Sequence, residues 1–196
     1  MDGGRTYSLL KEGETYNSGN NHWHNITYDP YSDGVWASQG DGDNSRVYYT
    51  TDWGATWQSV LGTHPTDIFP FEDKVVFGRD KTGERPGMDK WMRNEGSFTQ
   101  VTEVFNFRND KWSFNFYPSR SNWYSDNPDV YYILYPPHEP TEHKSYVYGT
   151  GDGGDTWHLI YNGDLATSSM TGIDKNGYVY GIGSRNLYRS KAVKWN

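Results

Sequence analysis

The chain of 196 residues contains no cysteine, so no disulfide bond holds its fold together. Long apolar runs are also missing, and none approaches the roughly 18 residues that a membrane-spanning helix needs. No window of about ten residues places apolar side chains at helical spacing, so we expect essentially no helix. These absences exclude a disulfide-stapled scaffold, a helical membrane protein and a helical domain.

Basic residues are few as well, because 18 Lys and Arg stand against 25 Asp and Glu and give a formal charge of −7. Phosphate recognition relies on clustered Lys and Arg, so this balance argues against a nucleic-acid partner. The first residues, Met1–Gly4, lack the basic start and the apolar stretch of a signal peptide. Composition therefore leaves the compartment open, the cytoplasm included.

Aromatic and glycine residues are plentiful instead. Only 34% of the residues are hydrophobic, yet 17% are aromatic, and the chain holds 17 Tyr and 22 Gly. Such a composition is typical of short strands joined by tight turns around an aromatic core. The length suits one domain with a substantial core, or part of a larger one.

One segment occurs twice, at 47–57 and at 147–157, with the pattern Val-Tyr-x-Thr-x-Asp-x-Gly-x-Thr-Trp. The Asp carboxylate can accept backbone N–H groups from the residues after it and so close a turn. Gly supplies a positive φ, and Trp anchors the returning strand in an apolar layer. Each copy therefore predicts a hairpin with a structural turn, formed by Asp52, Gly54, Thr56, Trp57 and by Asp152, Gly154, Thr156, Trp157. A clipped third copy begins at Asp2.

This pattern resembles the Asp-box, or BNR repeat, of sialidase-like, sortilin-like and xyloglucanase-like proteins. The resemblance implies a β-propeller in which the boxes are structural and lie on the outer, lower edge. It also implies that functional loops lie on the opposite, upper face. Adhesive relatives of this kind favour an extracellular or virion-associated location.

Four repeating units follow along the chain, at about 14–62, 63–103, 104–162 and 163–196, and residues 1–13 could add a strand that completes a blade. We therefore expect an all-β fold, a β-propeller of about four four-stranded blades. A β-sandwich is the alternative. The ring could be closed by the N-terminal strand, or the chain could be an arc of a larger propeller. An open arc would expose aromatic faces and favour self-association.

The loops of the expected upper face carry aromatic and polar residues suited to stacking on sugar rings and bonding their hydroxyls. Each aromatic could equally belong to the core between blades. The ligand-binding candidates are Tyr16, Trp23, His24, Asp43, Arg46, Arg79, Arg108, Trp112 and His138.

His22 and His24 open the first inner strand and share one of its faces. They could donate protons, or form half of a metal site with His64, His138 or His143. The alternative is a hydrogen-bonded pair that lines a wet channel.

The segment 41–45 resembles the start of a calcium loop but also an ordinary hairpin loop, so we predict no cofactor.

Sialidase chemistry would need three Arg residues and a Phe/Tyr-Arg-Ile-Pro segment, and that segment is missing from this sequence. The weak catalytic candidates are His22, His24, Asp67 and Arg108.

The leading hypothesis is a recognition module that binds a glycan or another surface polymer. The alternatives are a glycoside hydrolase or polysaccharide lyase, and a scaffold that binds a protein partner. Fold-level kinship does not choose among them.

Overall fold

The structure is a computed structural model, and it describes residues 9, 11, 22–40, 45–61, 65–79, 87–95, 102–106, 131–135, 145–163, 167–173, 176, 178–183 and 187–189. In these ranges the chain forms antiparallel β-strands and one 3-10 turn, Arg93–Glu95, and no α-helix. No helix of the described part is long and apolar enough to cross a membrane.

Four separate sheets follow one another in sequence. The first contains β1 (Trp23–Asp29), β2 (Gly34–Gln39), β3 (Arg46–Thr50) and β4 (Gln58–Leu61), and the second contains β5 (Pro65–Pro70), β6 (Lys74–Arg79), β7 (Gly87–Met92) and β8 (Thr102–Asn106). The third contains β9 (Tyr131–Tyr135), β10 (Ser145–Thr150) and β11 (His158–Gly163), and the fourth contains β12 (Thr167–Ile173), β13 (Val179–Gly183) and β14 (Leu187–Arg189).

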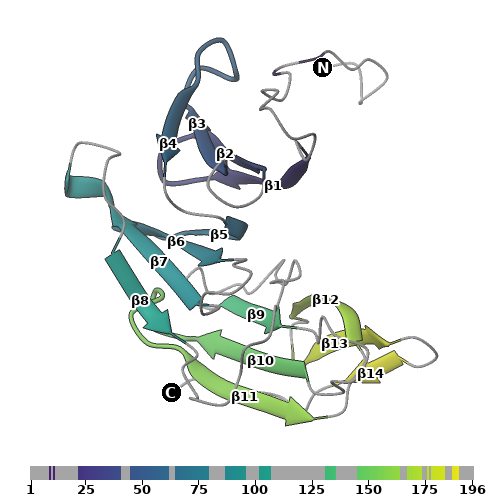
Figure 1. Cartoon of the computed structure of the whole chain (residues 1–196). Helices are drawn as coiled ribbons and strands as arrows, with labels where there is room; N and C mark the ends of the chain where they lie inside the picture. The colour runs from purple at the N-terminus through teal and green to yellow at the C-terminus, as the bar shows by residue number, and fades with distance from the viewer. Residues whose placement is uncertain are drawn as a thin grey trace.

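Each sheet is a meander in which neighbours in sequence are hydrogen-bonded neighbours in space. The sheets are arranged along an arc, with β1 and β5 on its inner side and β4 and β11 on its outer side (Figure 1). The inner strands β1 and β5 are in contact with each other. Consecutive antiparallel meanders in radial order define an all-β propeller architecture.

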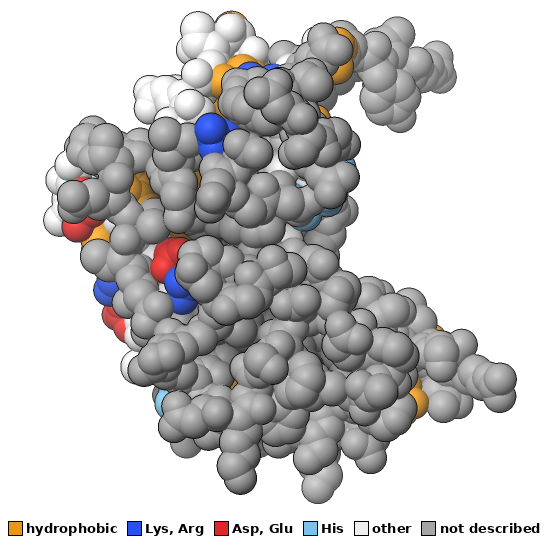
Figure 2. Space-filling view, viewed as in Figure 1, with side chains coloured by type: hydrophobic (Ala, Val, Ile, Leu, Met, Phe, Trp, Pro, Cys, Tyr) orange, Lys and Arg blue, Asp and Glu red, His pale blue; other side chains and the backbone are white. Residues whose placement is uncertain are grey.

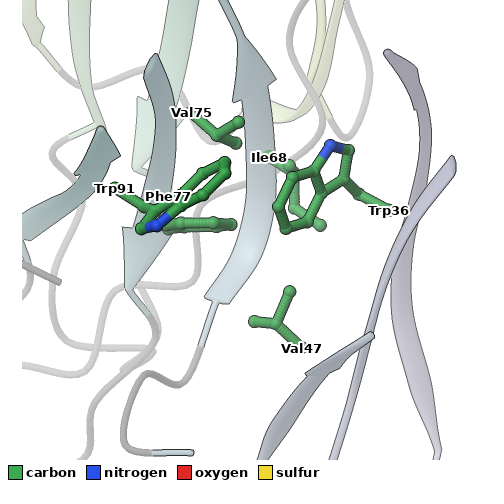
Figure 3. Close-up of a cluster of buried hydrophobic side chains, with 6 residues drawn as sticks. All are labelled: Trp36, Val47, Ile68, Val75, Phe77 and Trp91. Atoms are coloured by element: carbon green, nitrogen blue, oxygen red, sulfur yellow. The ribbon is translucent and has the colours of Figure 1, made fainter. Parts of the chain in front are cut away.

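Aromatic side chains fill the space between the first two sheets. Strand pairing places Trp36 opposite Tyr49 on β3, so both rings lie on the same face of the first sheet and stack with their centroids 4.1 Å apart. The Trp36 ring also lies 5.8 Å from Phe77 and 5.9 Å from Trp91, both on the second sheet. Figure 3 shows Trp36 and Val47 on one side of this layer and Ile68, Val75, Phe77 and Trp91 on the other. The alternation of side chains along each strand thus builds an aromatic inter-sheet core.

A buried carboxylate joins these two sheets beside that core. Asp29 is fully buried at the end of β1 and accepts a hydrogen bond of 2.8 Å from the Trp36 indole. The guanidinium of Arg93, which follows β7, contacts both Asp29 oxygens at 2.9 Å. A buried charge is tolerated when it is paired and hydrogen-bonded in this way.

The second and third sheets meet through the turn that precedes β11. Trp157 packs on Phe69 with ring centroids 5.5 Å apart. Gly154 lies so close to Phe71 that an added Cβ would come within 2.6 Å of its ring. A Cβ at this position would overlap the Phe71 ring, so the packing here requires glycine in addition to the positive φ of 82°.

Some sequence predictions fall on other positions or outside the described residues. Strand β8 ends at Asn106, close to the approximate unit boundary predicted at 103. The N-terminal strand predicted for residues 1–13 lies outside the described residues except for Leu9 and Lys11.

Candidate functional site

The two repeated segments form matching turns at one edge of the propeller, which we call the lower edge. We call residues 50–57 the first Asp turn and residues 150–157 the second Asp turn. Asp52 accepts hydrogen bonds from the Thr56 backbone at 2.9 Å and from the hydroxyls of Thr56 at 2.6 Å and Thr50 at 2.7 Å. Asp152 accepts the corresponding bonds from Thr156 and Thr150. Gly54 and Gly154 have φ values of 90° and 82°.

These hydrogen bonds hold both carboxylates in the ionised form. The Thr56 hydroxyl and backbone, followed by Thr50, lower the pKa of Asp52 from 3.8 to about 2. Partial burial alone would raise the pKa of Asp152. The hydrogen bonds from Thr156 and Thr150 outweigh this effect and lower the pKa of Asp152 as well. A carboxyl group with a lowered pKa stays ionised near neutral pH, so it cannot act as a general acid there.

The opposite, upper edge of the first sheet carries the two histidines. The His22 carbonyl accepts the Gly40 N–H at 3.0 Å, and the His24 ring nitrogen Nε2 bonds the Gly40 carbonyl at 3.1 Å. The two imidazole rings lie 4.4 Å apart in an edge-to-face arrangement. Histidine atoms, coloured pale blue, lie beside the hollow at the right of the molecule in Figure 2. The rings therefore line the inner side of the arc, and His24 is anchored to the backbone.

Trp23 lies between these histidines in sequence and is 39% exposed. Its ring packs against the buried ring of Tyr48, with centroids 5.6 Å apart. The ammonium of Lys11 lies 4.3 Å from the centroid of the same tyrosine. Strand pairing puts Trp23, Gln39 and Arg46 in one row across the sheet. The exposed ring of Trp23 and the partly exposed guanidinium of Arg46 thus flank Gln39, which is buried, at the upper end of one sheet.

Two charged residues that the sequence offered as site candidates, Asp67 and Arg79, lie within strands and not in loops. Asp67 is 3% exposed within β5 and accepts the Asn25 amide of the first sheet at 3.1 Å. Arg79, the last residue of β6, lies with its Nε 3.5 Å from the carboxylate of Asp89, which is 6% exposed. Asp67 thus connects the first two sheets, and Arg79 connects the neighbouring strands β6 and β7. Arg46, the first residue of β3, donates to the Ser45 carbonyl at 2.8 Å.

The remaining predicted site residues lie outside the described residues. They are Tyr16, Asp43, Arg108, Trp112, His138, the partner histidines His64 and His143, and Asp2 of the clipped third copy. Their roles stay predictions. Within the described part of the chain, no group of three or more His, Cys, Asp or Glu side chains is gathered as a metal would require.

Sequence reasoning missed a group of exposed side chains at the lower end of the first sheet. Tyr28 is 50% exposed and Trp53 is 66% exposed, and their rings lie nearly parallel with centroids 6.5 Å apart. The signal was available in the repeat, because Trp53 stands where the second copy has Gly153.

Comparisons with known proteins support the fold and do not identify a family. No family model matches the chain, and no curated protein matches its sequence. Nineteen chains of known structure resemble it. One is the β-propeller domain of Cps50 (Swd1) from Myceliophteria thermophila, with 10% identity and a TM-score of 0.55 over 89% of this chain and 52% of that one.

Another is the α-L-arabinofuranosidase Arb93A from Fusarium graminearum, solved with an iminosugar inhibitor. It has 13% identity and a TM-score of 0.51 over 96% of this chain and 67% of that one. The chain therefore spans about half the length of the first propeller and about two thirds of the second. Such low identities show the fold alone, which is a β-propeller.

Proposed function

We propose that the protein is a recognition module that binds a glycan or another surface polymer at its upper edge. The observation that carries this proposal is the exposed ring of Trp23, backed by Tyr48 and placed in one row with Gln39 and Arg46. An aromatic face offers a flat apolar surface to the C–H face of a sugar ring. The partly exposed guanidinium of Arg46 can donate hydrogen bonds to its hydroxyls.

The buried carboxylates favour recognition over hydrolysis in the described part of the upper half. Glycoside hydrolysis needs two carboxyl groups that both reach the scissile bond. Asp67 and Asp89 are 3% and 6% exposed; Asp67 accepts a hydrogen bond from Asn25, and Asp89 forms an ion pair with Arg79. The likeness to Arb93A extends only to the fold, so a glycoside hydrolase remains an alternative function, and a protein-binding scaffold is another.

A glycan array followed by calorimetry tests the proposal. We expect binding to at least one glycan class, and we expect Trp23→Ala to weaken it tenfold or more, which corresponds to about 1.4 kcal/mol. Leu159→Ala is the matched control, because Leu159 is 49% exposed on the outer strand of another sheet. No binding across the array, or equal losses in both variants, would overturn the proposal. Release of reducing ends by the wild-type protein would favour the hydrolase.

A further inference from the structure

The lower end of the first sheet presents an exposed apolar surface. Ile26 is 60% exposed and Tyr28 is 50% exposed, and because they are two residues apart on β1 they share one face of the sheet. Trp53 of the first Asp turn is 66% exposed and completes the surface. We call these three side chains the aromatic platform.

The two aromatic rings of the platform are nearly parallel. The planes of Tyr28 and Trp53 differ by 16°, and their centroids lie 6.5 Å apart. The hydroxyl of Tyr28 donates to the carboxylate of Asp33 at 2.8 Å, which fixes the phenol ring. This hydrogen bond also raises the pKa of Tyr28, so the phenol stays neutral. The phenol ring is thus held in place, while both aromatic side chains stay exposed to solvent.

The backbone at Trp53 indicates that its ring has a role beyond the turn. Trp53 has a φ of 57°, in the left-handed region that bulky residues rarely adopt, whereas the second Asp turn has Gly153 there with a φ of 69°. The turn can therefore form with glycine at this position, and its geometry does not require a tryptophan. A strained residue that the local fold does not need is a reason to look for a function.

The first Asp turn is also less charged than its twin. Ala55 occupies the position of Asp155, whose carboxylate bonds Lys74 of the preceding sheet. The second turn is thus adapted to pack on a sheet of the same chain. Compared with the second turn, the first turn carries an indole ring at Trp53 in place of glycine and an uncharged residue at Ala55 in place of aspartate.

The size of the platform favours a small ligand over a protein partner. A fully buried aromatic side chain covers roughly 150–250 Å², so three partly exposed side chains offer a few hundred Å² at most. A stable protein interface needs about 800 Å² from each partner. One or two sugar rings match the platform far better.

From these observations we propose that the aromatic platform is a second glycan-binding site, specific for a neutral sugar. The sugar ring would stack its C–H face on Trp53 and Tyr28, and its hydroxyls would donate to the exposed carboxylate of Asp33. A carboxylate accepts several hydrogen bonds, so Asp33 can serve both Tyr28 and a ligand. The same charge, in a chain of net charge −7, repels sugars that carry carboxylates.

Tryptophan fluorescence and calorimetry with defined hexasaccharides test this inference. The neutral probes are cellohexaose, xylohexaose and mannohexaose, and the anionic probe is hexagalacturonate. We expect at least one neutral probe to bind and the anionic probe to bind at least tenfold more weakly. Trp53→Gly should abolish neutral binding while the thermal midpoint stays at or above that of the wild type, because glycine relieves the backbone strain. Loss of binding together with a lower midpoint would point to a purely structural tryptophan and overturn the inference.

The variant Trp23→Ala separates this inference from the proposed function, which uses the other end of the same sheet. Neutral binding that survives Trp23→Ala and disappears in Trp53→Gly supports the platform. The reverse result overturns the platform and leaves the upper-edge proposal intact. If Trp53→Gly leaves binding unchanged but lowers the particle mass measured by light scattering, the platform is a self-association surface and the inference fails.

Discussion

The ammonium group of Lys74 is hydrogen-bonded to the carboxylate of Asp155, although the two residues lie 81 positions apart. Lys74 is 2% exposed on β6, and Asp155 belongs to the second Asp turn, so the pair joins the second and third sheets. Acidic and basic side chains of the described residues lie close together along one flank of the molecule (Figure 2). Inter-sheet cohesion thus combines apolar packing with ion pairs.

Removing the charge of Asp155 should weaken that junction moderately. We expect Asp155→Asn to lower the free energy of unfolding by about 1 kcal/mol, because the carboxylate is largely exposed and solvent screens its charge. Ala55→Asp is the matched control at the equivalent position of the first turn, and we expect a change within about 0.5 kcal/mol. Urea unfolding of both variants measures the difference. Equal effects would show that the ion pair contributes nothing specific.

The same ion pair predicts a loss of stability at high pH. Burial alone would lower the pKa of Lys74, but the bond to Asp155 and the charge of Asp73 outweigh it and raise the pKa above 10.5. A raised pKa stabilises the fold fully below the unfolded value, and this contribution is lost as the pH rises through the folded value. The wild type should therefore lose its advantage over Asp155→Asn above about pH 10.5. Thermal midpoints of both proteins from pH 8 to 12 check this, and a constant difference would refute it.

Acid should weaken the first Asp turn, because Asp52 has its pKa lowered from 3.8 to about 2. A lowered pKa contributes stability above the unfolded value, and that contribution disappears as the pH falls from 3.8 towards 2. We expect Thr56→Val, which removes the hydroxyl bonded to Asp52, to raise this pKa. Carboxyl chemical shifts measured by NMR titration give both values directly. An unchanged pKa in the variant would contradict the assigned cause.

The buried ion pair between Asp29 and Arg93 should be worth more than any exposed one. Asp29 is fully buried and accepts bonds from Arg93, Trp36 and the Tyr31 backbone. Asp29→Asn leaves the guanidinium without its counter-charge, so we expect a loss of about 3 kcal/mol. Asp33→Asn is the control, because Asp33 is exposed in the same hairpin and asparagine accepts its φ of 47°. Chemical denaturation that ranks the two variants equally would contradict this prediction.

The local features of the fold could be predicted from the sequence. Asp52 bonds to Thr56 four residues away, and Asp152 repeats that bond with Thr156, so the repeated segment contains all that each turn needs. The four repeating units likewise indicated an all-β propeller. These contacts depend on chemistry within a few neighbouring positions.

The contacts between sheets could not be read from the sequence. Asp29 and Arg93 lie 64 positions apart, and Asn25 and Asp67 lie 42 apart, so nothing local links them. The sequence therefore offers Asp67 as a catalytic candidate, whereas in the structure it is buried against the first sheet. Trp53 was overlooked because the repeat pattern leaves its position undefined.

Gly54 and Gly154 offer the sharpest test of how the third sheet is placed. Both have a positive φ, so alanine should cost each about 1 kcal/mol through backbone strain. At Gly154 the new methyl group would also lie 2.6 Å from Phe71 and 3.2 Å from Val76. This overlap should add about 1–3 kcal/mol. Gly154→Ala should therefore destabilise the protein distinctly more than Gly54→Ala in urea unfolding. Equal losses would mean that the second Asp turn does not pack against the β5–β6 hairpin.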